Sequence, residues 1–183
     1  FTTQTGGSNG ADITLNNGST AISLAGFTTE GNLTLETTNA IALTANTVNG
    51  NLSVTSGGAI TQSAALTVSG NSSFTSTGTD TNITLNTDTN AFTGSVTLTT
   101  AGTSGDVSID NGTTALGIQG TINGALTVRN GQVITDSGTL TVSGASSFTI
   151  DNGSNHITLD TAALTGAIGV STTGTSNFTL DNV

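Results

Sequence analysis

Apolar residues recur along the chain as short triplets, in which two aliphatic or Phe side chains flank one small polar residue. Examples are Ile13-Thr14-Leu15, Leu33-Thr34-Leu35, Leu66-Thr67-Val68 and Phe148-Thr149-Ile150. Alternation with a period of two residues predicts a β-strand with one buried face. Gly, Asn, Asp and Ser fill the intervals between triplets, and these residues form turns. No stretch has the apolar spacing of an amphipathic helix, so we predict an all-β chain.

A long internal repeat organises these triplets. Residues 50–75, GNLSVTSGGAITQSAALTVSGNSSFT, return at 124–149 as GALTVRNGQVITDSGTLTVSGASSFT, and 16 of the 26 aligned positions are identical. Nearly all the apolar positions match, which predicts that they form one stacked core. The predicted core residues are Leu52, Val54, Ile60, Leu66, Val68, Phe74, Leu126, Val128, Ile134, Leu140, Val142 and Phe148.

The distance between successive triplets predicts the architecture. Ile13 and Leu33 are 20 residues apart, and Leu33 and Leu52 are 19 residues apart. A strand position that recurs at this spacing indicates a parallel β-helix, or β-solenoid, of about 18–20 residues per coil and roughly ten coils. A pair of immunoglobulin-like sandwiches is the alternative all-β fold. Such sandwiches usually contain a core Trp or a conserved Tyr, and this chain has neither residue type.

The repeat also divides the chain. We expect one continuous solenoid over residues 1–183, in which residues 50–123 form one 74-residue unit of four coils. Residues 124–183 form a partial second copy, and residues 1–49 form a partial copy with one extra coil. The extra coil follows from the 94-residue offset between the similar segments 15–22 and 109–116. The chain begins with Phe and both ends fall inside the repeat, so we expect it to be processed or cut from a longer protein.

Composition excludes several classes of function. The net charge is −10, and the sequence contains one Arg, Arg129, and no Lys. Affinity for nucleic acid comes from such cations, so the balance argues against a nucleic-acid partner. We interpret Arg129 as a residue on a solvated face. The absence of Cys excludes disulfides and thiolate metal sites. No apolar stretch is long enough for a membrane span, so we expect no membrane insertion.

Few residues are candidates for chemistry. Asp110, Asp151 and Asp181 each precede an Asn, and they are candidates for weak surface calcium sites. Asp-Asn pairs ordinarily form turns, and the calcium-binding nonapeptide repeat is absent. His156 has Ser and Asp neighbours in the sequence, but no motif for an activated nucleophile surrounds it. We therefore predict that the chain is not an enzyme and has no catalytic, cofactor-binding or metal site.

Alternative functions remain open for a solenoid of this composition. One is a polysaccharide-binding or polysaccharide-degrading β-helix, with carboxylate pairs such as Asp106 with Asp110 or Asp80 with Asp88. An ice-binding or calcium-binding solenoid is another, since the strands carry many outward Thr residues. Glycosylation sequons, several of them at predicted turns, begin at Asn17, Asn32, Asn51, Asn71, Asn82, Asn111, Asn152 and Asn177.

The repeated phrases GNLSVTSGGAITQSAALTVSG, NITLNTDTNAFTGSVTL and GALTVRNGQVITDSGTLTVSG resemble the repeats of very large bacterial exoproteins, the filamentous-haemagglutinin-like adhesins. The resemblance implies a right-handed β-helix shaft that is exported to the cell surface or the extracellular space. It defines no individual binding residue. We therefore expect a structural fibre or adhesin shaft. Neither end of the chain shows a cap, a charge cluster or a Pro, so we expect it either to continue into more coils of a longer chain or to stack end to end into filaments. A host-cell or surface glycan is the ligand that such a protein would present its surface to.

Overall fold

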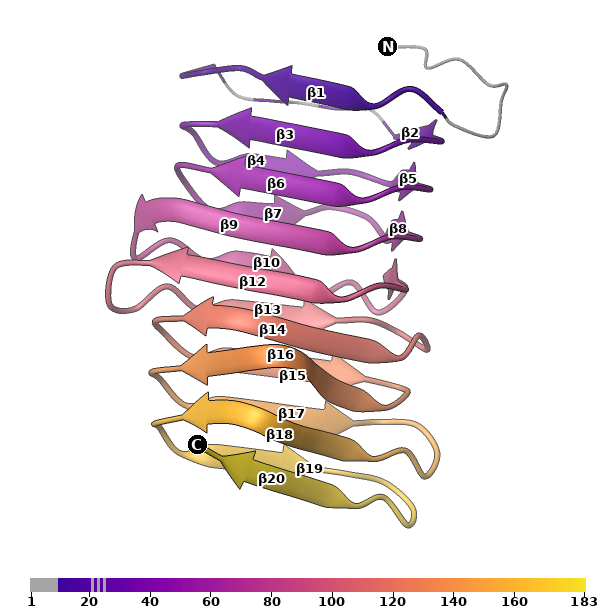
Figure 1. Ribbon diagram of the computed structural model, residues 1–183, viewed down its shortest axis with the longest axis vertical. Helices are drawn as coiled ribbons and strands as arrows, with labels where there is room; N and C mark the ends of the chain where they lie inside the picture. The colour runs from indigo at the N-terminus through magenta and orange to yellow at the C-terminus, as the bar shows by residue number, and fades with distance from the viewer. Residues whose placement is uncertain (1–9, 21, 23, 25) are drawn as a thin grey trace.

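The chain is built from stacked, parallel β-strands. A computed structural model describes residues 10–20, 22, 24 and 26–183. Within these residues every paired strand runs parallel to its neighbours, in three sheets that wrap around one core (Figure 1). The same residues contain no helix that is long and apolar enough to cross a membrane.

The front sheet of Figure 1 has nine strands among the described residues. They are β1 (Ile13–Asn16), β3 (Leu33–Thr37), β6 (Leu52–Ser56), β9 (Ser72–Thr79), β12 (Val96–Ala101), β14 (Leu116–Ile122), β16 (Ile134–Val142), β18 (Ile157–Leu164) and β20 (Phe178–Asn182). The back sheet contains β4 (Ile41–Leu43), β7 (Ile60–Gln62), β10 (Ile83–Leu85), β13 (Val107–Asp110), β15 (Leu126–Asn130), β17 (Ser146–Ile150) and β19 (Ile168–Ser171). A short side sheet contains β2 (Phe27–Thr29), β5 (Asn46–Val48), β8 (Leu66–Val68) and β11 (Ala91–Phe92).

The path of the chain is a right-handed coil. Front strands point to the left in Figure 1, back strands point to the right, and the chain descends from β1 to β20. The predicted parallel β-solenoid is thus confirmed, but it makes about eight turns between β1 and β20 rather than ten. The turns are longer than expected because loops lengthen some of them. Paired front-sheet residues are 18 positions apart at Leu116 and Ile134 but 24 apart at Ser72 and Val96.

The 74-residue repeat does not equal a whole number of turns, so its two copies differ by half a turn around the axis. Leu52 lies in β6 of the front sheet, whereas its equivalent Leu126 lies in β15 of the back sheet. From β6 the chain passes the front strands β9, β12 and β14 before it reaches β15, so 74 residues make three and a half turns. The expectation of four coils per unit is wrong. An apolar triplet buries its two large side chains equally well in either sheet, so the triplets alone do not say which sheet they join.

The core runs along the whole axis between the sheets. All twelve predicted core residues are buried, each with at most 3% of its surface exposed. Phe74 and Phe92 meet edge to face, with ring centroids 5.7 Å apart. Ser72 and Ser146 precede Phe74 and Phe148 by two positions, so one small and one large side chain share the inward face of β9 and of β17.

Glycines of successive turns stack at the corners of the coil, and their position also shows the half-turn shift of the repeat. A Cβ atom on Gly50 would lie 2.7 Å from the carbonyl oxygen of Gly31, one turn earlier, so the backbones approach too closely for any side chain. Gly31 and Gly50 stand just before front strands. Gly124 and Gly144 form the same contact just before back strands, where a Cβ on Gly144 would lie 2.5 Å from the Gly124 carbonyl oxygen. The column has moved from one corner of the cross-section to the opposite one.

Candidate functional site: the polar corner at Arg129

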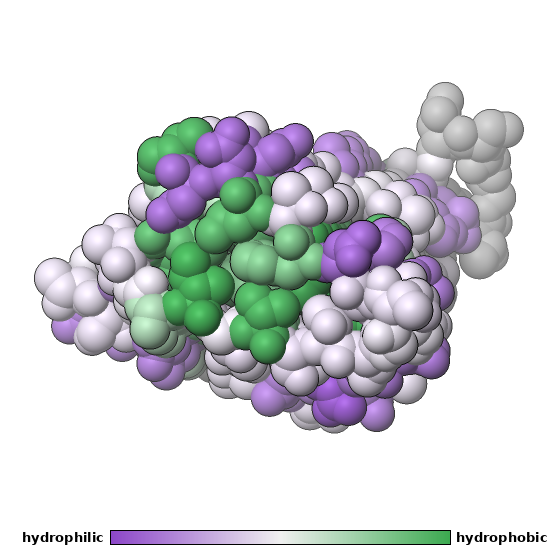
Figure 2. Space-filling model, turned by 90° about the horizontal axis from the view of Figure 1, so that it is seen from below, coloured by the Kyte–Doolittle hydropathy of each residue, from purple (hydrophilic) through white to green (hydrophobic). Residues whose placement is uncertain are grey.

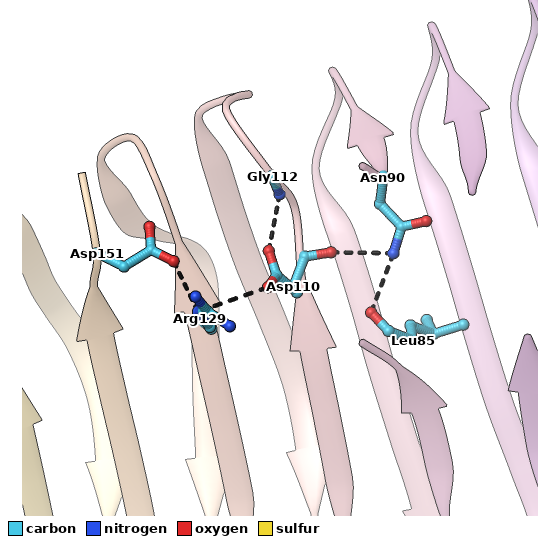
Figure 3. Close-up of polar contacts among 6 residues, drawn as sticks. All are labelled: Leu85, Asn90, Asp110, Gly112, Arg129 and Asp151. Atoms are coloured by element: carbon cyan, nitrogen blue, oxygen red, sulfur yellow. Dashed lines mark hydrogen bonds and ion pairs between the residues drawn. The ribbon is translucent and has the colours of Figure 1, made fainter. Parts of the chain in front are cut away.

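Three charged residues stack on successive turns at the end of the back-sheet strands. Asp110 ends β13, Arg129 lies beside it in β15, and Asp151 directly follows β17. Arg129 Nε lies 2.6 Å from Asp151 Oδ2 and 3.9 Å from Asp110 Oδ2 (Figure 3). The chain's single Arg therefore joins three turns. Its side chain is 57% exposed, which agrees with a surface position, but it is held by two carboxylates rather than solvated alone.

Asp110 is the buried member of this corner. Its side chain is only 7% exposed, and its Oδ1 accepts a hydrogen bond of 2.9 Å from the Gly112 N–H. Burial raises the pKa of the Asp110 carboxyl group, although the Gly112 N–H and the charge of Arg129 oppose that rise. The hydrogen bond and the charge of Asp151 raise the pKa of Arg129 still further above its usual value. The Asp110 carboxylate therefore makes its shorter contact within its own turn, to Gly112, and its longer contact to Arg129.

One turn before Asp110, the buried Asn90 bridges three turns through its carboxamide group. Its Nδ2 donates to the backbone oxygens of Leu85 and Asp110, at 3.1 and 2.9 Å (Figure 3). Its Oδ1 accepts from the Leu66 N–H at 2.9 Å and from the Gln62 side chain at 2.8 Å. Sequence reasoning missed this residue, because Asn90 lies in a loop of Asn, Thr and Asp that reads as ordinary turn composition.

Asn111 closes the edge of the side sheet. The residue is fully buried, and its Oδ1 accepts the Phe92 N–H at 2.7 Å while its Nδ2 donates to the Phe92 oxygen at 3.1 Å. The carboxamide group therefore replaces the backbone of a further strand beside β11, the last strand of that sheet. Asn182 makes the same two bonds to Leu164, at 2.7 and 3.1 Å.

The three calcium candidates do not come together. Asp110 and Asp151 flank Arg129 at the back-sheet corner, whereas Asp181 is exposed in β20 of the front sheet. Over the part of the chain that the structure describes, no group of three or more His, Cys, Asp or Glu side chains could hold a metal ion. Gly112 has φ of +58° and follows the Asp110-Asn111 pair, as the turn interpretation of this pair requires.

The other carboxylates of interest also bond to neighbouring turns. Asp106 and Asp110 lie at opposite ends of β13, and Asp106 accepts the Ala125 N–H at 2.7 Å. Asp80 accepts the N–H groups of Thr103 and Ser104, at 2.7 and 2.9 Å. Each carboxylate therefore joins one turn to the next.

Two segments of the chain match a single family model, that of repeats of unknown function (DUF5649). The matches cover residues 30–99 and 104–171. The chain belongs to the DUF5649 repeat family. The first DUF5649 copy starts at the glycine corner before β3 of the front sheet, and the second starts before β13 of the back sheet. Arg129 and its two carboxylate partners belong to the second copy. In the first copy, Thr55 occupies the position equivalent to Arg129, so the ion-paired corner is specific to one copy.

The other comparisons add no relative. No curated protein and no solved structure matches the chain. The DUF5649 assignment therefore gives the repeat and, with the structure, its β-solenoid form. Its description assigns no activity to these repeats.

Proposed function

We propose that this chain is a length of an extracellular structural shaft, in a fibre or an adhesin, that spans distance and presents its surface. The observation that carries the proposal is the parallel ladder that continues without a break from β1 to β20. Each turn of such a ladder adds about 4.8 Å of length, so eight turns span about 40 Å. Length that grows in proportion to the number of turns is what a spacer requires.

Polar side chains reinforce this ladder along its axis. The N–H groups of Asn32, Asn51 and Asn71 each donate to the Oδ1 atom one turn earlier, on Asp12, Asn32 and Asn51, at 2.8 Å. His156 takes the same position in a later turn, where its Nδ1 accepts the Asn177 N–H at 3.0 Å. Side chains that elsewhere would recognise ligands here hold successive turns together, which supports a mechanical role.

The resemblance of the repeats to filamentous-haemagglutinin-like exoproteins supports the extracellular part of the proposal. Protease resistance would suit that location. The chain offers trypsin a single cleavage site, and that residue, Arg129, lies in the strand β15 and is ion-paired. Cleavage there would require local unfolding of several hydrogen-bonded turns.

Immunogold electron microscopy of the cells that encode the chain tests this function. Antibodies raised against the purified chain should label fibres or projections outside the cell. The same serum, absorbed beforehand with purified chain, is the matched control and should give no label. Label confined to the cell interior would overturn the proposal.

A further inference from the structure

Asn-Gly pairs recur at the turns of this chain, and each is a candidate for spontaneous chemistry. The backbone nitrogen that follows an Asn can attack the Asn side chain, and a following Gly leaves that nitrogen most accessible because Gly has no Cβ atom. Within the described residues, Asn-Gly pairs begin at Asn17, Asn49, Asn111, Asn123, Asn130 and Asn152. The structure separates these pairs by how firmly it holds each nitrogen and each carboxamide group.

Two of the pairs are locked inside the coil. Asn111 and Asn130 are both 0% exposed. The Asn130 carboxamide group donates to the backbone oxygens of three residues at 3.1 Å each, those of Thr114, Gln132 and Val133. Asn111 is held in a similar way, by its bonds to the neighbouring turn. Reaction at either pair would first require local unfolding of the solenoid.

Two other pairs are held across the turns. Asn49 Nδ2 donates to Glu30 Oε2 at 2.9 Å. The Gly50 N–H donates to the backbone oxygen of Gly31, one turn earlier, at 3.2 Å. The pair that begins at Asn123 is held in the same manner, by a bond of 2.7 Å from its carboxamide group and one of 3.0 Å from its Gly N–H. In both pairs the attacking nitrogen is thus occupied as a hydrogen-bond donor.

The pair formed by Asn152 and Gly153 differs from these. It lies in the turn between β17 and β18, and both residues are exposed (Figure 2 views the C-terminal end of the coil, near this turn). Over the described part of the chain, neither the Asn152 carboxamide group nor the Gly153 N–H has a hydrogen-bond partner. Gly153 has φ of +69°, and a Cβ placed on it would meet its nearest atom at 3.4 Å, so the turn is open. Asn17 is also exposed, but the Gly18 N–H donates to Asn16 Oδ1 at 3.2 Å.

We propose that Asn152 is a site of spontaneous deamidation, which converts it to aspartate and isoaspartate. The Gly153 nitrogen gives up its proton to a base and forms a bond to Asn152 Cγ. The bond from Cγ to Nδ2 then breaks, and the leaving nitrogen takes up a proton and departs as ammonia. Water opens the resulting imide ring at either of its carbonyl carbons and leaves a carboxylate where the amide was. The net reaction consumes water, releases ammonium and needs no enzyme or cofactor.

The new carboxylate arises at the polar corner. Asp151 directly precedes it and already pairs with Arg129 at 2.6 Å, and Asp110 lines the same surface hollow. The chain has no second Lys or Arg to pair with the added charge. Isoaspartate also lengthens the backbone beside the Gly153 oxygen, which accepts a hydrogen bond of 2.9 Å from Thr173 Oγ1 on the next turn. Deamidation therefore adds negative charge to the corner and alters a contact between successive turns.

Timed incubation of the purified chain at neutral and mildly alkaline pH, followed by peptide mapping with mass spectrometry, tests this site. In the folded chain, Asn152 should convert at least about tenfold faster than Asn49 or Asn123, because the held pairs must first open. Its rate should rise with pH, since the deprotonated Gly153 nitrogen is the nucleophile. In chain unfolded with guanidinium, all Asn-Gly pairs should convert at similar rates.

Two variants assign the product to its residue. Asn152→Gln should remove the dominant product, because the longer side chain closes a larger ring much more slowly. Asn49→Gln is the matched control and should leave conversion at Asn152 unchanged, and circular dichroism checks that both variants fold. Hydroxylamine, which cleaves the imide, should split the folded chain into residues 1–152 and 153–183. Equal rates at Asn152 and Asn49 in the folded chain, or an undiminished preference for Asn152 after unfolding, would overturn the inference.

Discussion

Replacing the buried Asn111 should destabilise the solenoid more than replacing an exposed Asn whose carboxamide group makes the same two backbone hydrogen bonds. Asn111→Ala removes the acceptor of the buried Phe92 N–H and the donor to the Phe92, Thr114 and Ala115 oxygens. A buried polar group left without a partner costs about 1–3 kcal/mol. One lost N–H acceptor and weakened carbonyl contacts together predict a loss of about 2–4 kcal/mol.

Asn182→Ala is the matched control for this prediction. Asn182 makes the same two bonds to Leu164, but it is exposed in the last turn, so water can replace its carboxamide group. The expected loss is less than about 1 kcal/mol. Asn111→Asp provides a second comparison, because one carboxylate oxygen would face three backbone oxygens. That variant should be less stable than Asn111→Ala near neutral pH and should recover when acid protonates the new carboxyl group.

Urea denaturation and native-state hydrogen exchange measure these effects. Exchange is needed because a solenoid can lose some turns before others, so one unfolding midpoint does not describe every region. In Asn111→Ala, the Phe92 amide should exchange much faster than in the unmodified chain. The reasoning is refuted if Asn111→Ala and Asn182→Ala lose equal stability, or if the Phe92 amide keeps its protection.

Three further predictions concern side chains inside and around the core. Ser72→Ala should leave stability unchanged or raise it by up to about 1 kcal/mol in urea denaturation, because the buried Ser72 hydroxyl has no partner. Ser56→Ala is its control and should be destabilising, since the Ser56 hydroxyl donates to the Asn39 oxygen at 2.6 Å. Asp110→Asn keeps an acceptor for its turn and removes a carboxylate whose pKa burial raises. Because that pKa is raised, the unmodified chain loses stability as pH rises and the Asp110 carboxyl group loses its proton. The free energy of unfolding of Asp110→Asn should therefore increase relative to that of the unmodified chain between about pH 4 and about pH 7. An equal difference at both pH values would contradict the assignment. Removal of calcium with a chelator should leave the thermal midpoint unchanged, because Arg129 already pairs with both neighbouring carboxylates; a fall of several degrees would reveal a metal site.

The sequence predicts the fold well because the inward positions repeat at short range. Triplets such as Leu52-Ser53-Val54 place two apolar side chains on one face of a strand, and the spacing of about one turn places each strand against the next. Local alternation and turn composition suffice for this, and neither depends on which sheet a strand joins. Strand identity and core burial therefore follow from residues close together in the chain.

The phase of the repeat and the number of turns could not be predicted in the same way. Leu52 and Leu126 occupy equivalent positions of the repeat, yet they lie in opposite sheets. The half-turn results from the sum of many loop lengths, including the long turn between Ser72 and Val96. An error of a few residues in each loop is enough to change the count from eight turns to ten.

The candidate site was predicted only where its contacts are local. The turn at Asp110-Asn111 is encoded by adjacent residues, and the positive φ of Gly112 agrees with it. The bonds from Asn111 to Phe92 and from Arg129 to Asp151 join residues 19 and 22 positions apart. Those partners become visible only once the strand register is known.

The half-turn offset determines how a long array of such repeats would meet its surroundings. If further repeats join in the same manner, odd-numbered and even-numbered copies point equivalent loops in opposite directions from the rod. Equivalent features would then alternate every three and a half turns, about 17 Å apart along the axis. An antibody or a surface lying against one side would find every second copy. A single repeated sequence would thus decorate both flanks of the rod.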